Sequence, residues 1–154
     1  MKSRFLIPEL DLHQYYKNIC NTRMVSYQDF KKNYYKRTWI KQEPKTHNCG
    51  QIAVAVIVGT SLSEVIKVVG KKGSTTTKEV AKALREYGYK CPDRLKRMPK
   101  PKLAIGHLRY PNQYSSHWVV IDDDKIYDGI HGKPDGTVNW KDEWRITSYL
   151  PITK

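Results

Sequence analysis

Residues 49–58 read Cys49-Gly50-Gln51-Ile52-Ala53-Val54-Ala55-Val56-Ile57-Val58, and the run ends at Gly59. A segment that is apolar on every side is either a buried strand or a buried helix, and its periodicity does not distinguish the two. The length of ten residues and the small side chains of Ala53 and Ala55 favour the helix. We therefore predict a buried helix that begins at Cys49.

Two further helices are predicted to follow this one. The pattern Ser61-Leu62-Ser63-Glu64 is a capping box, and it opens a helix that runs through Val69 and ends at Gly70. Thr76-Thr77-Lys78-Glu79 opens the next helix, which ends at Gly88. Its apolar residues recur at helical spacing, at Val80, Ala83, Leu84 and Tyr87.

The pattern changes to strands after residue 102. Strands are predicted over residues 103–109, 116–121 and 125–127, and a last segment at 140–152 is either a strand or a short helix. Helices followed by an antiparallel sheet define an α+β fold. We predict a single globular domain at residues 39–154, preceded by an N-terminal helical extension at residues 1–38 with aromatic-rich helices at 9–20 and 27–37.

The chain is basic, with 28 Lys and Arg against 15 Asp and Glu in 154 residues and a formal net charge of +13. All of this excess lies in residues 1–101, because residues 102–154 hold seven basic and seven acidic side chains. The densest stretch, residues 90–102, is a proline-punctuated loop that would suit an acidic partner or a phosphate, or is a solvated linker. No nucleic-acid-binding module accompanies it, so a nucleic-acid partner has no support from a motif.

Other classes of protein are disfavoured. No apolar run approaches the roughly 20 residues of a membrane-spanning helix, and the first residues lack the apolar core of a signal peptide. Cys20, Cys49 and Cys91 are odd in number and form no Cys-x-x-Cys pair, which argues against a disulfide framework and a cysteine-rich zinc site. The histidines form no recognisable set of metal ligands. We expect a cytoplasmic protein with free thiols that uses no membrane, cofactor or metal.

Cys49 is the first candidate for chemistry, since it lies between a polar loop and the predicted buried helix. The unpaired N–H groups and the positive dipole end at a helix N-terminus stabilise a thiolate over a thiol. Gly50 has no Cβ and would leave room for a substrate carbonyl to approach those N–H groups. The alternative interpretation of Cys49 is a buried, inert cysteine.

His117 and Asp128 are further candidates, and hairpin geometry relates them. If Asp122 and Asp123 form a two-residue loop, His117 lies directly opposite Asp128, with Cβ atoms roughly 4.5–5.5 Å apart. The carboxylate would then hold one imidazole nitrogen and leave the other to face a thiolate. A three-residue loop would instead place Gly129 opposite His117. The alternative interpretation, for each residue considered alone, is that His117 is an ordinary strand histidine and that Asp128 is an ordinary turn residue.

Catalysis by a thiol requires a general base, a group that orients the base, and donors for the oxyanion. Gln42 is a candidate oxyanion donor, because its side-chain amide lies just upstream of Cys49. The alternative is an exposed loop glutamine. The predicted catalytic residues are therefore Cys49, His117, Asp128 and Gln42.

These residues resemble the motifs of papain-like cysteine peptidases. The order is Gln42, then Asn48-Cys49-Gly50 at an apolar helix, then His117-Trp118-Val119-Val120-Ile121, then Tyr127-Asp128-Gly129. Over roughly residues 40–130 the chain is most similar to the double-glycine leader peptidase domains of bacteriocin exporters and their stand-alone relatives. The resemblance implies a papain-like fold, in which Cys49 is the nucleophile, His117 the general base, Asp128 its orienter and Gln42 the oxyanion donor.

The chain departs from the family pattern at three places. Asn48 stands where the family has Asp before the cysteine, and Gly129 stands where it has Pro after the aspartate. Gln42 lies seven positions before Cys49 instead of six, where this chain has Glu43. A one-residue insertion in the loop would reconcile that spacing.

The function predicted from these residues is a thiol-dependent hydrolase that cleaves a peptide, isopeptide or other amide bond through an acyl-enzyme. Its expected substrate is a peptide or protein, and the basic surface would suit an acidic one. By resemblance, the cleavage site would contain small residues or a double glycine. One alternative is a catalytically silent papain-like fold that acts as a basic binding or inhibitory module for an acidic protein or nucleic acid. The other is a basic nucleic-acid-binding protein without an enzymatic site.

Overall fold

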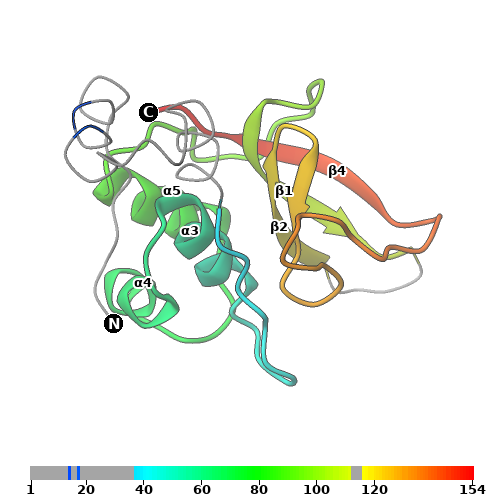
Figure 1. Cartoon of the computed structure of the whole chain (residues 1–154), viewed down its shortest axis with the longest axis horizontal. Coiled ribbons are helices and arrows are strands. Elements are labelled where there is room, and N and C mark those ends of the chain that lie inside the picture. The colour runs from blue at the N-terminus through cyan, green and yellow to red at the C-terminus, as the bar shows by residue number, and fades with distance from the viewer. Residues whose placement is uncertain (1–13, 15–16, 18–36, 112–115) are drawn as a thin grey trace.

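Helices and an antiparallel sheet lie side by side and pack against each other (Figure 1). The computed structural model describes Gln14, Lys17 and residues 37–111 and 116–154. Its labelled elements are α3 (Cys49–Val58), α4 (Leu62–Val69), α5 (Thr77–Glu86), β1 (Leu103–Arg109), β2 (Ser116–Asp122), β3 (Lys125–Tyr127) and β4 (Arg145–Pro151). Helices that precede an antiparallel sheet in the chain confirm the predicted α+β class.

The helix α3 is the buried helix that the sequence predicts, and it begins at Cys49. Every residue from Gly50 to Val58 is buried, because α3 contacts α4, α5 and β2. Gly59 ends the helix with a φ of 81°, a left-handed conformation that glycine adopts without a Cβ clash. Its N–H donates a 2.9 Å hydrogen bond to the Ala55 carbonyl. The helix thus lies at the centre of the core, and only its first residue, Cys49, is half-buried.

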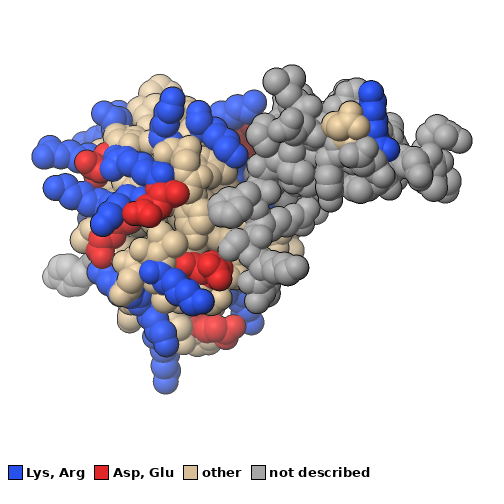
Figure 2. All heavy atoms as spheres, turned by 90° about the vertical axis from the view of Figure 1, so that its left-hand side faces the viewer, with Lys and Arg blue, Asp and Glu red and all other residues tan. Residues whose placement is uncertain are grey.

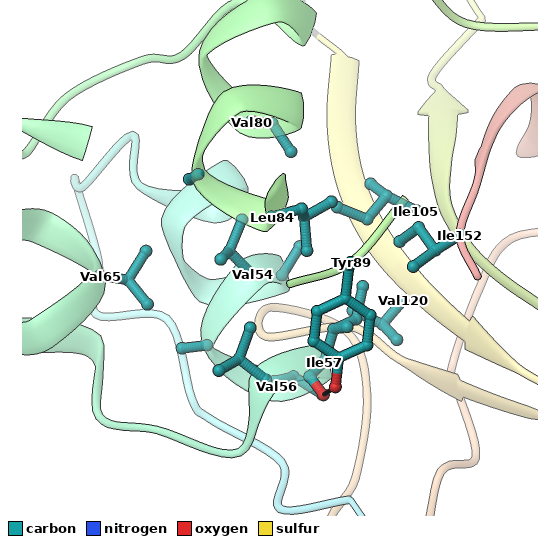
Figure 3. Packing of buried hydrophobic residues seen from close by; sticks show 14 of the residues in the cluster. Val54, Val56, Ile57, Val65, Val80, Leu84, Tyr89, Ile105, Val120 and Ile152 are labelled. Atoms are coloured by element: carbon teal, nitrogen blue, oxygen red, sulfur yellow. Dashed lines mark hydrogen bonds between the residues drawn. The ribbon is translucent and has the colours of Figure 1, made fainter. Parts of the chain in front are cut away.

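Local capping interactions position the next two helices. Ser61 accepts a hydrogen bond from the Glu64 N–H at the start of α4, and Thr76 and Glu79 form both bonds of a capping box at the start of α5. The buried side chains of these helices pack with those of α3, as Figure 3 shows for Val65, Val80 and Leu84. Both predicted helices are confirmed.

The sheet has the strand order β3-β2-β1-β4, and all of its pairs are antiparallel. One face packs against the helices through residues that include Ile105 and Val120 (Figure 3). The opposite face packs Leu108, Val119 and Ile121 against a second cluster that contains aromatic side chains of the C-terminal third. The three predicted strands are confirmed, and the segment at residues 140–152 contributes a strand, β4, and no helix.

The register predicted for the hairpin of β2 and β3 is wrong. Asp122 pairs with Lys125, so the two-residue loop is formed by residues 123–124 and not by residues 122–123. Each β2 residue therefore pairs with a residue two positions further along the chain than predicted. Neither Asp128 nor Gly129 is opposite His117 in this register.

Contacts of the turn explain this register. Asp123 adopts a φ of 55°, a left-handed conformation that Asp tolerates better than most residues. Its N–H donates to the Lys102 carbonyl (2.8 Å), and its own carbonyl accepts from Lys100 Nζ (2.8 Å). These bonds to the segment before β1 hold Asp123 in the turn and leave Asp122 in the strand.

The basic segment at residues 90–102 runs beside the C-terminal end of the chain. Lys90 forms an isolated bridge with Thr153, and Lys96 forms one with Tyr149. Figure 2 shows the face that lies at the left of Figure 1, where α4 is located, and Lys and Arg side chains spread over much of it. Binding of an acidic partner or a phosphate by residues 90–102 remains a prediction.

Most of the predicted extension, residues 1–38, lies outside the described residues, as does Cys20; Gln14 and Lys17 are both helical. Arg37 donates to the Ile57 carbonyl (2.6 Å) and pairs with Asp122 (2.8 Å), so the chain contacts the core from residue 37 onward. Across the described part of the chain, no single helix is long and apolar enough to cross a membrane. The pair α3 and α4 meets that test only jointly, with a bend of 115° between them.

Candidate active site

His117 and Asp128 form a buried pair at one end of β2. His117 is 3% exposed and Asp128 is fully buried, and His117 Nε2 lies 2.7 Å from Asp128 Oδ1. Asp128 directly follows the last residue of β3. Continuing the observed register by one residue would place Asp128 opposite Val119, which shares a strand face with His117. The two residues therefore meet diagonally, and the pair forms although they are not directly opposed.

Five hydrogen bonds hold the Asp128 carboxylate. Oδ1 accepts from His117 Nε2 and from the N–H groups of Ile130 (2.9 Å) and His131 (3.1 Å). Oδ2 accepts from Trp140 Nε1 (2.8 Å) and lies 3.3 Å from His131 Nδ1. Burial alone would raise the pKa of Asp128, but the bonds and charge of His117 and the bond from Trp140 hold that pKa well below its usual range. Asp128 is therefore an ionised carboxylate with a fixed orientation.

Cys49 lies against the other side of His117. Burial lowers the pKa of His117, but its hydrogen bonds to Asp128 and Cys49, together with their charges, outweigh burial and raise that pKa to about 9. Because Nε2 is bonded to Asp128, the ring nitrogen that remains for the Cys49 sulfur is Nδ1. At neutral pH this arrangement places an imidazolium between a sulfur and a carboxylate, which is the charge state that a thiolate nucleophile requires.

Gln42 lies at the same site, where hydrogen bonds from its backbone and from its side chain fix its position. It is 8% exposed, its N–H donates to the Gly129 carbonyl (2.8 Å), and its Nε2 donates to the Thr46 carbonyl (3.0 Å). The second N–H of this amide has no bonded acceptor among the described residues, and the buried Oε1 has no partner there either. Glu43, at the spacing usual for the resembled family, is exposed and does not line the site. Of Gln42 and Glu43, only Gln42 is therefore among the described residues that line the cavity.

A cavity of about 530 Å³ joins these groups. It lies where the segment before α3 (cyan in Figure 1) passes between the helices and the sheet. The loop before α3, the residues just before α5, and the sheet with its loops all contribute to the lining, which consists of Gln42, Lys45, Thr46, His47, Cys49, Ser74, Thr75, Tyr110, Ser116, His117, Trp118 and Ile130. Three of the four predicted catalytic residues line it directly, and Asp128 lies behind His117.

Gly50 is required by the packing of Thr75 against α3. A Cβ on Gly50 would overlap Thr75 Oγ1 and would lie 3.2 Å from Val80 Cγ2. The approach of a substrate carbonyl to the N–H groups at this position remains a prediction. Gly129 has a similar constraint, because a Cβ there would lie 3.0 Å from the Ile40 carbonyl oxygen and 3.2 Å from the backbone nitrogen of Gln42.

Several residues of the site were not singled out from the sequence. Trp140 bonds the Asp128 carboxylate, and Trp39 Nε1 donates to the Asp128 carbonyl (2.8 Å). The rings of Tyr110 and His131 pack against Trp144 at centroid distances of 4.8 and 4.6 Å. Only His131 carries a sequence signal, since it lies three residues after Asp128, where a turn brings its N–H back to the carboxylate.

Burial, followed by the charges of Asp128 and Cys49, raises the pKa of Tyr110, which lines the cavity. The phenol is therefore neutral across the physiological pH range. Its ring is held by contacts with His131 and Trp144, so Tyr110 forms a rigid wall beside the sulfur and the imidazole.

His117, Asp128 and His131 each offer one ligand atom, and these atoms lie within 4.8 Å of one another. Two imidazoles and a carboxylate are a donor set that suits zinc. However, His117 Nε2 and Asp128 Oδ1 are bonded directly at 2.7 Å, closer than the roughly 3.3 Å between two ligands at 2.0–2.1 Å from a tetrahedral ion. The geometry is that of a hydrogen-bonded pair. The absence of a functional metal remains a prediction.

The comparisons with protein families and with curated proteins identify no relative. No protein-family model matches this sequence, and no curated protein matches it detectably. The interpretation of the site therefore depends on its own geometry and on the motifs in the sequence.

Proposed function

We propose that this protein is a cysteine hydrolase of papain-like fold that cleaves a peptide, isopeptide or other amide bond. The observation that carries the proposal is the alignment of Cys49, His117 and Asp128: Cys49, at the N-terminus of α3, and His117 line one cavity, and Asp128 is bonded to His117 from behind. The five hydrogen bonds on Asp128 support it, because they fix the carboxylate, and the carboxylate in turn fixes the orientation of the His117 ring.

The mechanism would begin with attack of the Cys49 thiolate on the substrate carbonyl carbon. The oxyanion that forms would accept hydrogen bonds from backbone N–H groups at the start of α3 and from the free N–H of the Gln42 amide. His117 Nδ1 would give its proton to the leaving nitrogen, so that the C–N bond breaks and a thioester remains on Cys49. His117, now neutral, would take a proton from water, which attacks the thioester and releases the acid product.

The expected substrate is a peptide or protein, and small residues or a double glycine at the cleavage site remain part of the proposal by resemblance. The basic surface in Figure 2 supports an acidic partner, since clustered cations attract anions. The chemistry requires a reduced thiol, which fits the cytoplasm.

The test compares the rate of iodoacetamide labelling at Cys49 and Cys91 between pH 5 and 9, read by peptide mass spectrometry. Cys91 is a suitable internal control, because burial raises the pKa of its thiol and it lies outside the cavity. We expect Cys49 to react at least tenfold faster than Cys91 at pH 6, and the change His117→Ala to remove that advantage.

Equal rates at the two cysteines would overturn the proposal. In that case the remaining candidates are a catalytically silent binding module and a basic nucleic-acid-binding protein without an enzymatic site. Hydrolysis is tested separately with a peptide library, on which Cys49→Ala must abolish any cleavage. A cleavage that survives Cys49→Ala would assign the activity to another site.

A further inference from the structure

The described residues that line the cavity include a lysine, Lys45, and no Asp or Glu. The carboxylate of Asp128, which lies behind the wall, is fully buried and bonded through both oxygens. The first turn of α3 opens onto the cavity at Cys49 and contains no acidic residue, so the positive end of the helix dipole faces this site without a carboxylate beside it. A negatively charged group that enters the cavity would meet positive charge without an opposing carboxylate.

Lys45 is held at the cavity by an unusual backbone conformation. It occupies the third position of a turn in which the Thr46 N–H donates to the Glu43 carbonyl (3.3 Å), and its φ is 65°. That position of a turn favours Gly or Asn, because a side chain with a Cβ is strained at positive φ. The strain at Lys45 is a reason to expect that its side chain has a function.

The rest of the loop is fixed by hydrogen bonds. Thr46 Oγ1 donates to the Glu43 carbonyl (2.6 Å) and contacts Asn48 Oδ1 (3.1 Å), and the Thr46 carbonyl accepts from Gln42 Nε2 (3.0 Å). These bonds connect the Lys45 turn to Gln42 and to the N-cap of α3. No ion pair of Lys45 is found among the described residues, so its ammonium group is available to a ligand.

We infer that the cavity selects a peptide with a carboxylate close to the bond that is cleaved, and that Lys45 is the residue that recognises this carboxylate. The carboxylate is an Asp or Glu side chain of the substrate, or a free C-terminus. As a statement about substrate choice, this inference rests on the proposed hydrolase function. The preference of the cavity for a negative charge does not depend on hydrolysis, so the charge preference and the hydrolase activity can be tested separately.

The first experiment compares alkylation of Cys49 by iodoacetate and by iodoacetamide. Both reagents form the same S–C bond and release iodide, but iodoacetate carries a carboxylate and iodoacetamide is neutral. The ratio of their rate constants therefore cancels the fraction of thiolate and reports the local charge. At low ionic strength we expect Lys45→Met to lower this ratio about three- to fivefold, with a smaller change in 1 M salt.

Two further variants make this result specific. Lys78→Met removes the same charge from an exposed position on α5 that does not line the cavity, and it should leave the ratio unchanged. Lys45→Gly relieves the backbone strain while it removes the charge, so it should lower the ratio as Lys45→Met does even if the methionine variant folds poorly. A ratio that stays within 1.5-fold of wild type in both Lys45 variants would overturn the inference.

The second experiment exposes a library of peptides to the wild-type protein and to Lys45→Met. We expect Asp, Glu or the C-terminal carboxylate to be enriched within about two residues of the cleaved bonds, and Lys45→Met to remove that enrichment. Cleavage without any preference for acidic residues would overturn this inference and leave the proposed function standing. No cleavage by the wild type, with the iodoacetate preference intact, would overturn the proposed function and support an anion-binding cavity.

Discussion

His117 Nε2 donates a 2.7 Å hydrogen bond to Asp128 Oδ1, although the two residues are not paired across the hairpin that carries them. The bond forms because Asp128 lies just beyond β3, where the chain turns and brings the N–H groups of Ile130 and His131 onto the same carboxylate oxygen. The carboxylate is thereby fixed by its own loop as well as by its bond to His117. The orientation of the imidazole follows from the loop after β3 and not from strand pairing.

The change Asp128→Asn tests this relationship. It removes the hydrogen-bonded anion that, together with Cys49, raises the pKa of His117, so the pKa should fall well below its wild-type value of about 9. A smaller fraction of the imidazole would then be protonated at pH 7, and Cys49 should react with iodoacetamide at least tenfold more slowly. The pKa of His117 can be followed by NMR titration of its ring. A pKa that stays near 9 in the variant would contradict the assigned role of Asp128.

The same pair predicts how stability depends on pH. The pKa of His117 is raised, so its stabilising contribution is complete below about pH 6.5 and is lost as the pH rises through about 9. The pKa of Asp128 is lowered, so its contribution is present above about pH 4 and is lost as the pH falls. For His117 the shift corresponds to about 3 kcal/mol as an upper limit.

Urea unfolding at pH 6.5 and pH 9.5 measures the His117 contribution. The wild type should lose about 2–3 kcal/mol more than His117→Gln between these two pH values. The variant serves as the control, since it retains the lysines and tyrosines that also titrate at high pH. Equal losses in both proteins would show that His117 is not held in its charged form by the fold.

Gln42 should affect hydrolysis but not alkylation. An oxyanion forms when a carbonyl is attacked and does not form when a thiolate displaces iodide, so only the first reaction uses the amide donor. For Gln42→Ala we expect kcat on a cleaved peptide to fall about 100-fold, with iodoacetamide labelling of Cys49 within twofold of wild type. Glu43→Gln, at the neighbouring exposed position, is the matched control and should change neither rate. A comparable loss in both variants would argue against a donor role for Gln42.

The contact between Gly50 and Thr75 predicts a specific pattern of stability. Gly50→Ala places a Cβ about where Thr75 Oγ1 now lies, and it should destabilise the protein by about 2–3 kcal/mol. Adding Thr75→Ala should recover part of that loss, because it removes the overlapping hydroxyl. Gly73→Ala is the control, since no atom lies within 4 Å of a Cβ at that position. Thermal or urea unfolding of the wild type, Gly50→Ala, Thr75→Ala, their double variant and Gly73→Ala measures these differences, and an additive double variant would contradict the predicted contact.

Interactions between near neighbours in the chain were predictable from the sequence. The caps at Ser61 and Thr76 act over three residues, and the ten-residue apolar run can be buried on all sides only as one central element. The same local signals placed Cys49 at the start of α3. They also identified His117 and Asp128 as partners, on the assumption of a register that the structure shows to be wrong.

The tertiary structure decided how the site is assembled. The register of the hairpin depends on bonds from Asp123 to the segment before β1, which no pattern within the hairpin encodes. The bond from Trp140 to Asp128 joins side chains brought together by the folding of a loop, and Thr75 fills the space over Gly50 only because α5 packs on α3. The residue types that can perform the chemistry are thus a property of the sequence. Their distances, charge states and access to a substrate arise from packing between segments that are remote in the chain. The free energy of that packing cannot be inferred from any local pattern of residues.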